Sequence, residues 1–399
     1  KLFSDSAEYS KELGRYEAVY TGYAISKNFR EKGSSGGLTN WLLSTLLKKG
    51  YIDAAIGVGE STQHTNKLFE YKIARSQSEI DKFAKSKYYP VELSKVLETV
   101  RETPGSYAIV TVPCFAKTIR AICDHDAVLK DRIKYVIGIV CGHMKTANFA
   151  KSLGWQVGIH PSQLAGFDFR VKVKGKLASR YDISATCVDD DDHLVKKNAS
   201  TMDLKGTDWG QGYFKLKACD FCDDVAAECA DITFGDAWLP NYVGDYRGTN
   251  IAIVRSRFLN DLLIESLEKK HINLERVSQK EFVESQAANY RHRHAGLAYR
   301  LHSKLKRLVI GINDKNLSVE DMRFLSAIKK QQQVEEKQLG GDLLTCGIEY
   351  CQFISQQICY KCKMHICVKH IKQSIFSSNF FCSQCYRATT IGKIDHFLH

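Results

Sequence analysis

Three closely spaced cysteines in the middle of the chain constrain its fold and chemistry more than any other feature. They are Cys219, Cys222 and Cys229, and the apolar run that follows them ends in Gly235-Asp236. Thiolates at such spacing bind an iron–sulfur cluster or zinc. A four-iron cluster needs a fourth ligand, and Cys141, directly after the apolar run 135–140, is the candidate. The alternative is three ordinary buried cysteines, because free Cys packs as a small hydrophobe.

Composition sets the general class of the protein. With 399 residues, 44% of them hydrophobic and 26% charged, the chain is predicted to be globular with two or three domains. Its 14 cysteines fall in short-spaced groups, which predicts a reducing compartment, the cytoplasm. No apolar run is long enough for a membrane span, so none is expected. The net charge of +12 favours anionic partners: phosphate-bearing cofactors, an acidic electron carrier or nucleic acid.

A glycine- and serine-rich turn near the amino terminus opens a predicted helix. The turn contains Ser35, Gly36, Gly37 and Thr39, and apolar residues at helical spacing follow it until Gly50. Such a turn frees backbone N–H groups beside the positive end of a helix, which suits a phosphate. A plain serine-capped helix start is the alternative.

The order of predicted elements indicates a mixed α/β fold with an antiparallel hairpin region. Strands are expected at 18–24, 52–58, 107–112, 135–140 and 248–255, and helices after Leu38, after Pro113 and at 258–270. Cys114 and Cys141 each follow a predicted strand, where open α/β sheets place their sites. Residues 167–188 alternate as a hairpin does. Residues 291–307 hold six Lys or Arg and no acid, which favours a basic surface helix or, alternatively, a nucleic-acid footprint.

The last sixty residues are predicted to form a small zinc module of their own. Eight ligands occur there in four pairs: Cys346 and Cys351, Cys359 and Cys362, Cys367 and His370, Cys382 and Cys385. Few apolar residues separate them, which is typical of a two-zinc module folded by its metals. We therefore predict an N-terminal part at 1–165, a C-terminal part at 166–328, a linker at 329–339 and the zinc-binding tail at 340–399.

Residues 10–310 resemble the family of coenzyme F420 hydrogenase/dehydrogenase beta subunits. The motifs that carry the resemblance are residues 34–39, 86–90, 112–115 and 137–141, the cysteine segment with 230–236, and 247–250. The resemblance implies bound FAD and a 4Fe-4S cluster. It implies that Ser35, Gly36, Gly37 and Thr39 lie at the FAD pyrophosphate and Lys87 near the flavin, with Cys114 in the cofactor-binding set. It also implies that Cys141, Cys219, Cys222 and Cys229 hold the cluster.

The function implied by this resemblance is electron relay. A flavin would exchange hydride with a carrier such as a deazaflavin, and the cluster would pass single electrons to a ferredoxin-like partner or substrate. The tail resembles the cysteine-rich domain of piggyBac-type transposases, although its first pair is wider. Two alternatives follow from the tail and the charge: a nucleic-acid-binding protein, or a non-catalytic component that docks partners.

Overall fold

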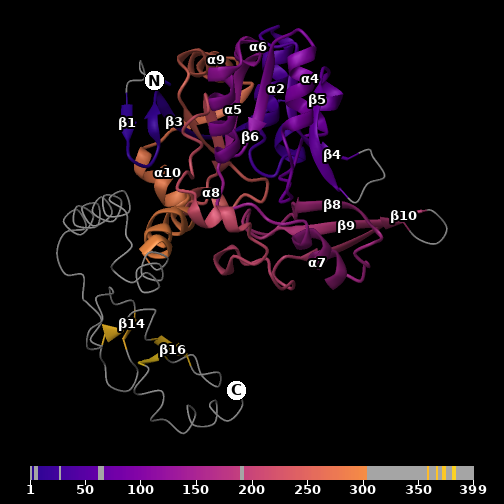
Figure 1. Cartoon of the computed structure of the whole chain (residues 1–399), viewed down its shortest axis with the longest axis vertical. Coiled ribbons are helices and arrows are strands. Elements are labelled where there is room, and N and C mark those ends of the chain that lie inside the picture. Colours follow the sequence, from indigo (N-terminus) through magenta and orange to yellow (C-terminus); the bar gives the residue numbers. More distant parts are fainter. Residues whose placement is uncertain are drawn as a thin grey trace, which may run out of the picture. The chain divides into compact units, whose positions relative to one another are not determined.

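An eight-stranded mixed sheet is the centre of the larger of two compact units, residues 1–307 (Figure 1). The computed structural model describes residues 2–3, 8–26, 28–61, 67–188 and 193–302, and the backbone of four short tail strands. The strand order is β13-β3-β12-β11-β7-β6-β4-β5. The strands are β3 (Ala18–Ala24), β4 (Ala54–Glu60), β5 (Phe69–Ala74), β6 (Tyr107–Thr111), β7 (Ile133–Ile139), β11 (Ile232–Asp236), β12 (Asn250–Val254) and β13 (Ile272–Arg276).

The four central strands β4, β6, β7 and β11 run parallel, and the flanking strands pair antiparallel to them or to one another. Parallel strands must be covered on both faces, so their residues are apolar almost throughout. Because their carboxyl ends share one edge, the segments after β6, β7 and β11 leave the sheet together. These segments begin at Val112, Val140 and Ala237, and Cys114 and Cys141 follow the first two.

Helices cover the two faces of the sheet in separate groups. The helices are α2 (Leu38–Lys48), α4 (Ser94–Glu102), α5 (Pro113–His125), α6 (Ala127–Arg132) and α9 (Arg257–Glu268), with the shorter α1 (Phe29–Lys32) and α3 (Gln77–Asp81) beside α2. One face packs α2 and α9 against residues such as Ala55 and Ala108, and the other packs α4, α5 and α6 against Ile56 and Ile109. The helical spacing of Leu38, Trp41 and Leu42 puts all three in the core, as expected.

A second, three-stranded antiparallel sheet lies below the ends of β4 and β5 in Figure 1. Its strands are β8 (Leu164–Val171), β9 (Asp182–Val188) and β10 (Leu194–Ser200), and α7 (Asn148–Gln156) packs on it. The predicted hairpin is confirmed in β8 and β9. The strand β10 was not anticipated, since its residues are polar and mostly exposed and show no buried alternation. A phenylalanine cluster that includes Phe69, Phe149 and Phe169 joins this sheet to β5.

The predicted division at residue 165 does not separate compact units. The main sheet places β3, from the first part, between β12 and β13, from the second. Short elements complete this unit: β1 (Glu8–Ser10), β2 (Gly14–Tyr16), α8 (Pro240–Val243), α10 (Gln279–Ser285), α11 (Ala287–Tyr290), the 3₁₀ turns Trp209–Gln211 and Lys217–Phe221, and a π-helical turn at Arg291–Ala295.

Residues 308–399 form the second compact unit. Its described strands pair as two short antiparallel hairpins, β14 (Gln357–Ile358) with β15 (His365–Ile366) and β16 (Ile371–Gln373) with β17 (Phe380–Cys382). The predicted linker at 329–339 and the predicted zinc ligands lie outside the described residues, apart from the backbone of Cys382 at the end of β17. Among the described residues, no helix has the length and apolar character to cross a bilayer.

Candidate functional site

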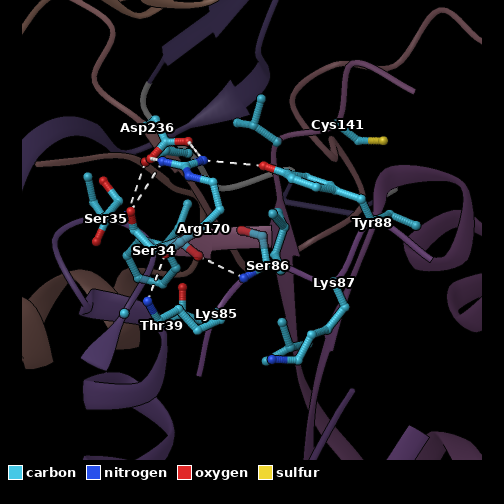
Figure 2. Close-up of a pocket in the computed structure, with 18 of the residues that line it drawn as sticks. Ser34, Ser35, Thr39, Lys85, Ser86, Lys87, Tyr88, Cys141, Arg170 and Asp236 are labelled. Atoms are coloured by element: carbon cyan, nitrogen blue, oxygen red, sulfur yellow. Dashed lines mark hydrogen bonds and ion pairs between the residues drawn. The ribbon is translucent and has the colours of Figure 1, made fainter. Parts of the chain in front are cut away.

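A cavity of about 660 Å³ opens at the carboxyl edge of the parallel strands. Its lining includes the start of α2, the segment 83–91, the ends of β6 and β7, and residues 284–289. In Figure 2, Ser35 and Thr39 lie at one side of this cavity and Cys141 at the other, and Tyr88 lies between Cys141 and Lys87. The volume is within the usual range for small-molecule and cofactor sites, roughly 300 to 1,000 Å³.

The Ser-Gly-Gly turn is fixed by the sheet behind it. The Ser35 hydroxyl donates to the Thr249 carbonyl at 2.8 Å, and the Leu38 N–H donates to Asn250 Oδ1 at 3.0 Å. Gly37 has a φ of +80°, and an added Cβ would lie 2.4 Å from the Phe29 carbonyl. Only glycine fits such a position, so the turn depends on it.

Three of the four predicted phosphate-binding residues line the cavity, and one does not. Ser35, Gly37 and Thr39 are in the lining. Gly36 is not: a Cβ there would lie 2.5 Å from the Gly22 carbonyl, so this glycine is needed for close packing against β3. The predicted place of Gly36 at a phosphate stays a prediction, and its observed contribution is close packing against β3.

A buried ion pair ties the turn to the cavity wall. The Arg170 guanidinium is 3.1 Å from Asp236 Oδ2 and donates to the Tyr88 hydroxyl at 3.2 Å and to the Ser34 carbonyl at 3.2 Å (Figure 2). The Arg170 side chain is only 3% exposed. Removing one partner of such a pair costs roughly 3–5 kcal/mol, because the other charge stays buried. Sequence reasoning missed Arg170, which sits in an alternating strand with no motif around it.

Lysines add positive charge around the turn. Burial lowers the pKa of Lys87 to about 8, and its Nζ donates to the Ala84 carbonyl at 2.6 Å. Burial also lowers the pKa of Lys172 to about 7, and its Nζ donates to the Ser35 carbonyl at 2.9 Å. Lys85 lies 3.4 Å from Asp168. An anionic ligand in the cavity would compensate these partly desolvated cations.

A histidine and a tryptophan form another wall of the cavity. The His143 ring lies 4.5 Å from that of Trp209, and the Nε2 of His143 has no hydrogen-bond partner among the described residues. Burial, with help from Lys145, lowers the pKa of His143 to about 3, so its imidazole is neutral. Lys145 donates from Nζ to the Tyr213 carbonyl at 2.6 Å. The wall thus offers one unpaired neutral imidazole nitrogen.

Four cysteines from three separate segments, Cys114, Cys141, Cys219 and Cys222, lie together beside this cavity. Burial raises the pKa of the Cys141 thiol to about 12, and the nearby thiols of Cys219, Cys114 and Cys222 add to the rise. The pKa of the Cys114 thiol is raised as well, first by burial and then by the nearby thiols of Cys222 and Cys219. The Met144 N–H donates to Cys219 Sγ at 3.3 Å. Cys141 lines the cavity, whereas Cys114 does not.

Cys229 is the third cysteine of the 219–229 segment and was also predicted as a ligand. It packs beside the hydrophobic cluster under α5, and its charged neighbours are Asp224, Lys117 and Glu228. The chain turns at Ala227, whose φ is +50°, and continues through Cys229 into β11. Cys114 thus lies with Cys141, Cys219 and Cys222, while the predicted place of Cys229 at the cluster stays a prediction. The sequence signal that Cys114 and Cys141 lie close together was their placement after adjacent strands.

The chemistry of this donor set suits an iron–sulfur cluster. Within the described ranges, no three His, Cys, Asp or Glu side chains are close enough to hold one metal ion. An iron–sulfur cluster held by four cysteines spreads its ligands more widely, because each thiolate binds a different iron. The donor set, four thiols with one at the cavity wall, fits such a cluster.

The basic segment 291–307 faces this group in the part that the structure describes. Arg300 donates to the Asp220 carbonyl at 2.8 Å, His294 lies 3.2 Å from the Asp223 carbonyl, and Arg293 is 2% exposed. The choice between a solvated basic helix and a nucleic-acid footprint stays a prediction for this segment, in which Arg291 is exposed while Arg293 and Arg300 turn toward the cysteine segment. Sequence could not show this, since basic runs are more often solvated than buried.

Comparison with known proteins places the chain in a family. Residues 19–98 match the family model described as the N-terminal part of the coenzyme F420 hydrogenase/dehydrogenase beta subunit, and residues 105–280 match that of its C terminus. Together the matches span well over half of the chain. It belongs to the family of coenzyme F420 hydrogenase/dehydrogenase beta subunits, an oxidoreductase family, as the sequence resemblance predicted.

Curated relatives and a solved structure agree with this placement. The coenzyme F420-dependent sulfite reductase of Methanocaldococcus jannaschii is 25% identical over 69% of this chain, which spans 41% of that protein. A component of the F420H2 dehydrogenase of Methanosarcina mazei is 29% identical over 27% of this chain and 29% of its own length. A chain of the F420-reducing [NiFe] hydrogenase complex from Methanosarcina barkeri shares the fold, with a TM-score of 0.53, 15% identity, and coverage of 72% of this chain and 94% of that one.

Proposed function

We propose that this chain is an FAD- and 4Fe-4S-dependent oxidoreductase that relays electrons between a hydride carrier and a one-electron partner. The observation that carries the proposal is the shared position of Cys141, which lines the cavity and also belongs to the four-cysteine group. A cofactor in the cavity would therefore adjoin the cluster. The family and the redox relatives support the same class.

The cavity suits FAD in size and charge. Ser35, Gly37 and Thr39 would lie at the pyrophosphate, beside the first turn of α2. Lys87 would place its charge near the isoalloxazine, where a cation favours the reduced anionic form. The rings of Tyr88 and Trp209, 4.8 Å apart between centroids, would exclude water from it. The FAD would supply the exchange between a two-electron hydride and single electrons.

For the cluster, we propose Cys114, Cys141, Cys219 and Cys222 as ligands. Cys141 and Cys219 are each 8% exposed, so two ligands are buried, while Cys114 is exposed. A cluster held between buried and exposed ligands would have one side toward the cavity and one toward the surface. Its role would be to pass electrons singly to a ferredoxin-like protein or substrate that binds on the exposed side.

For the hydride carrier, we propose a deazaflavin of the F420 type. The names of three relatives, the sulfite reductase, the dehydrogenase component and the hydrogenase complex, refer to that coenzyme. Since the chain spans 41% of the sulfite reductase and 29% of the dehydrogenase component, we propose that it supplies the coenzyme-oxidising or coenzyme-reducing module of a larger electron pathway.

For the tail, we propose two bound zinc ions. The eight paired Cys and His residues between Cys346 and Cys385 support this, as do the short antiparallel strand pairs, which are common in zinc modules. The resemblance to the cysteine-rich domain of piggyBac-type transposases leaves DNA or a protein as its partner. We propose a protein-docking role for the tail, because two cations of the basic segment, Arg293 and Arg300, are engaged with the cysteine segment.

The test is the cofactor content of the full chain purified without air. We expect about four iron atoms, about two zinc ions and one flavin per chain. Flavin identity follows from release by denaturation and chromatography against FAD and FMN standards. A preparation with neither flavin absorbance nor iron and sulfide would contradict the redox proposal, whereas iron without zinc would contradict only the zinc proposal.

A further inference from the structure

The structure holds one buried cation at the centre of the cysteine group, Arg293. Its Nη1 donates to the carbonyls of Cys219 at 3.2 Å and Cys222 at 3.3 Å. Its Nη2 donates to the Cys141 carbonyl at 3.3 Å and lies 3.7 Å from the Cys141 sulfur. One guanidinium thus joins two loops that are about eighty residues apart in sequence and together carry three of the four gathered thiols.

The local backbone explains how the side chain reaches this position. Residues Arg291–Ala295 form a π-helical turn between α11 and the helix that follows. A π turn inserts an extra residue into a helix, is rare, and is frequent at functional sites. The neighbouring Arg291 is exposed, whereas Arg293 is 2% exposed and points into the protein. The wider turn therefore directs one cation of the basic segment inward.

The charge of Arg293 lacks a carboxylate partner within the described part of the chain. Its described hydrogen bonds go to carbonyls and a sulfur, and its Nε has no hydrogen-bond partner there. An unpaired buried charge is strongly unfavourable, so it calls for a compensating anion. An iron–sulfur cluster on four thiolates carries net negative charge and gains more on reduction.

We infer that Arg293 is the positioning residue of the cluster: it joins the two cysteine loops and balances the cluster's charge, which raises its reduction potential. This inference rests on the proposed function. Hydrogen bonds and net charge around the sulfurs are established determinants of cluster potentials. The added negative charge of the reduced cluster is the part that a fixed buried cation stabilises most.

The test compares Arg293→Gln and Arg293→Lys with Arg291→Gln, a control that removes an exposed arginine from the same turn. Iron, sulfide and flavin content, far-UV circular dichroism and the cluster midpoint potential by electron paramagnetic resonance are measured for each. For Arg293→Gln we expect at least a tenfold shift toward the oxidised cluster at a given potential, about 59 mV for one electron, or loss of the cluster with flavin and fold retained. Arg293→Lys keeps the charge and should retain a potential closer to that of the wild type.

Two results would overturn the inference. One is Arg293→Gln with full iron and sulfide and the wild-type potential. The other is loss of flavin and of the circular dichroism signal together with iron in both Arg293 variants, which would make Arg293 a residue of general folding. A wild-type chain that binds no iron would instead contradict the proposed function itself.

Discussion

The two sides of the cavity are built in different ways. The Ser-Gly-Gly turn is one contiguous stretch, fixed by glycine geometry and by hydrogen bonds from Ser35 and to Asn250. The cysteine group comes from three separate segments, and Arg293 joins two of them. A contiguous motif can be read from sequence, while the full membership of a group assembled by the fold cannot. Mutations in the turn should therefore destabilise it through backbone strain. Mutations in the cysteine group should act through loss of a cluster ligand or of charge balance.

The largest expected effect is loss of iron from the cysteine group. Cys219→Ala removes a buried thiol of the group, and we expect nearly all iron and sulfide to be lost with flavin retained. The matched control is Cys123→Ala, which removes a thiol that packs in the hydrophobic cluster under α5. Iron and sulfide assays on anaerobic protein measure the difference. Equal iron in the two variants would contradict the assignment.

The next largest effect, a loss of stability, should come from the buried ion pair between Arg170 and Asp236 that supports the Ser-Gly-Gly turn. Asp236→Asn leaves Arg170 buried without its carboxylate, so we expect a loss of about 3–5 kcal/mol in the free energy of unfolding. Chemical denaturation followed by circular dichroism measures it. Glu92→Gln is the control, because Glu92 and Lys67 form an exposed pair that should contribute nothing measurable. A stability of Asp236→Asn equal to that of the control would show that the pair does not fix the turn.

The glycine turn itself gives a smaller effect. Gly37→Ala meets both a positive φ and the Phe29 carbonyl, whereas Gly50→Ala meets a positive φ of +73° and open space. The positive φ alone costs about 1–2 kcal/mol, and the clash should add about 1–3 kcal/mol to the Gly37 variant only. Flavin content should fall in Gly37→Ala while iron stays unchanged. If the two variants are equally stable and equally loaded with flavin, the close packing of the turn is irrelevant.

The smallest effect is a pH dependence at the turn. The pKa of Lys172 is lowered to about 7 from an unfolded value of 10.5 by burial. The unfolded chain therefore binds more protons between these values, and Lys172 contributes stability that rises with pH from about 7 toward 10. Lys172→Met lacks this slope, so the stability of the wild type relative to the variant should increase between pH 7 and pH 9. A difference that stays constant or decreases would contradict the burial of this amine.

The parts of the fold that sequence predicted are those with strong local periodicity. The helix from Leu38, the strand at Tyr107 and the strand before Cys141 follow from their buried spacing. The strands β10 and β13 were missed because their residues are polar and half-exposed. The pairing of β3 between β12 and β13 joins residues more than two hundred positions apart, which no local pattern encodes.

The same limit applies to the candidate site. Cys141, Cys219 and Cys222 were predicted from their spacing and their place after a strand, and the structure brings them together. Cys229 was grouped with them on spacing and on the family resemblance, and its place at the cluster stays a prediction, whereas Cys114 was not predicted as a ligand. Arg293 was hidden in a basic run, since only the π-helical turn and the packing of the loops decide that it points inward.

The measurement that tests the central claim most directly is the iron and sulfide content of Cys114→Ala and Cys229→Ala, each purified without air beside the wild type. If Cys114 is the fourth ligand, Cys114→Ala loses its four-iron cluster while Cys229→Ala keeps the wild-type content of iron, sulfide and flavin. Full iron in Cys114→Ala together with its loss in Cys229→Ala would contradict the four-cysteine group on which the account depends.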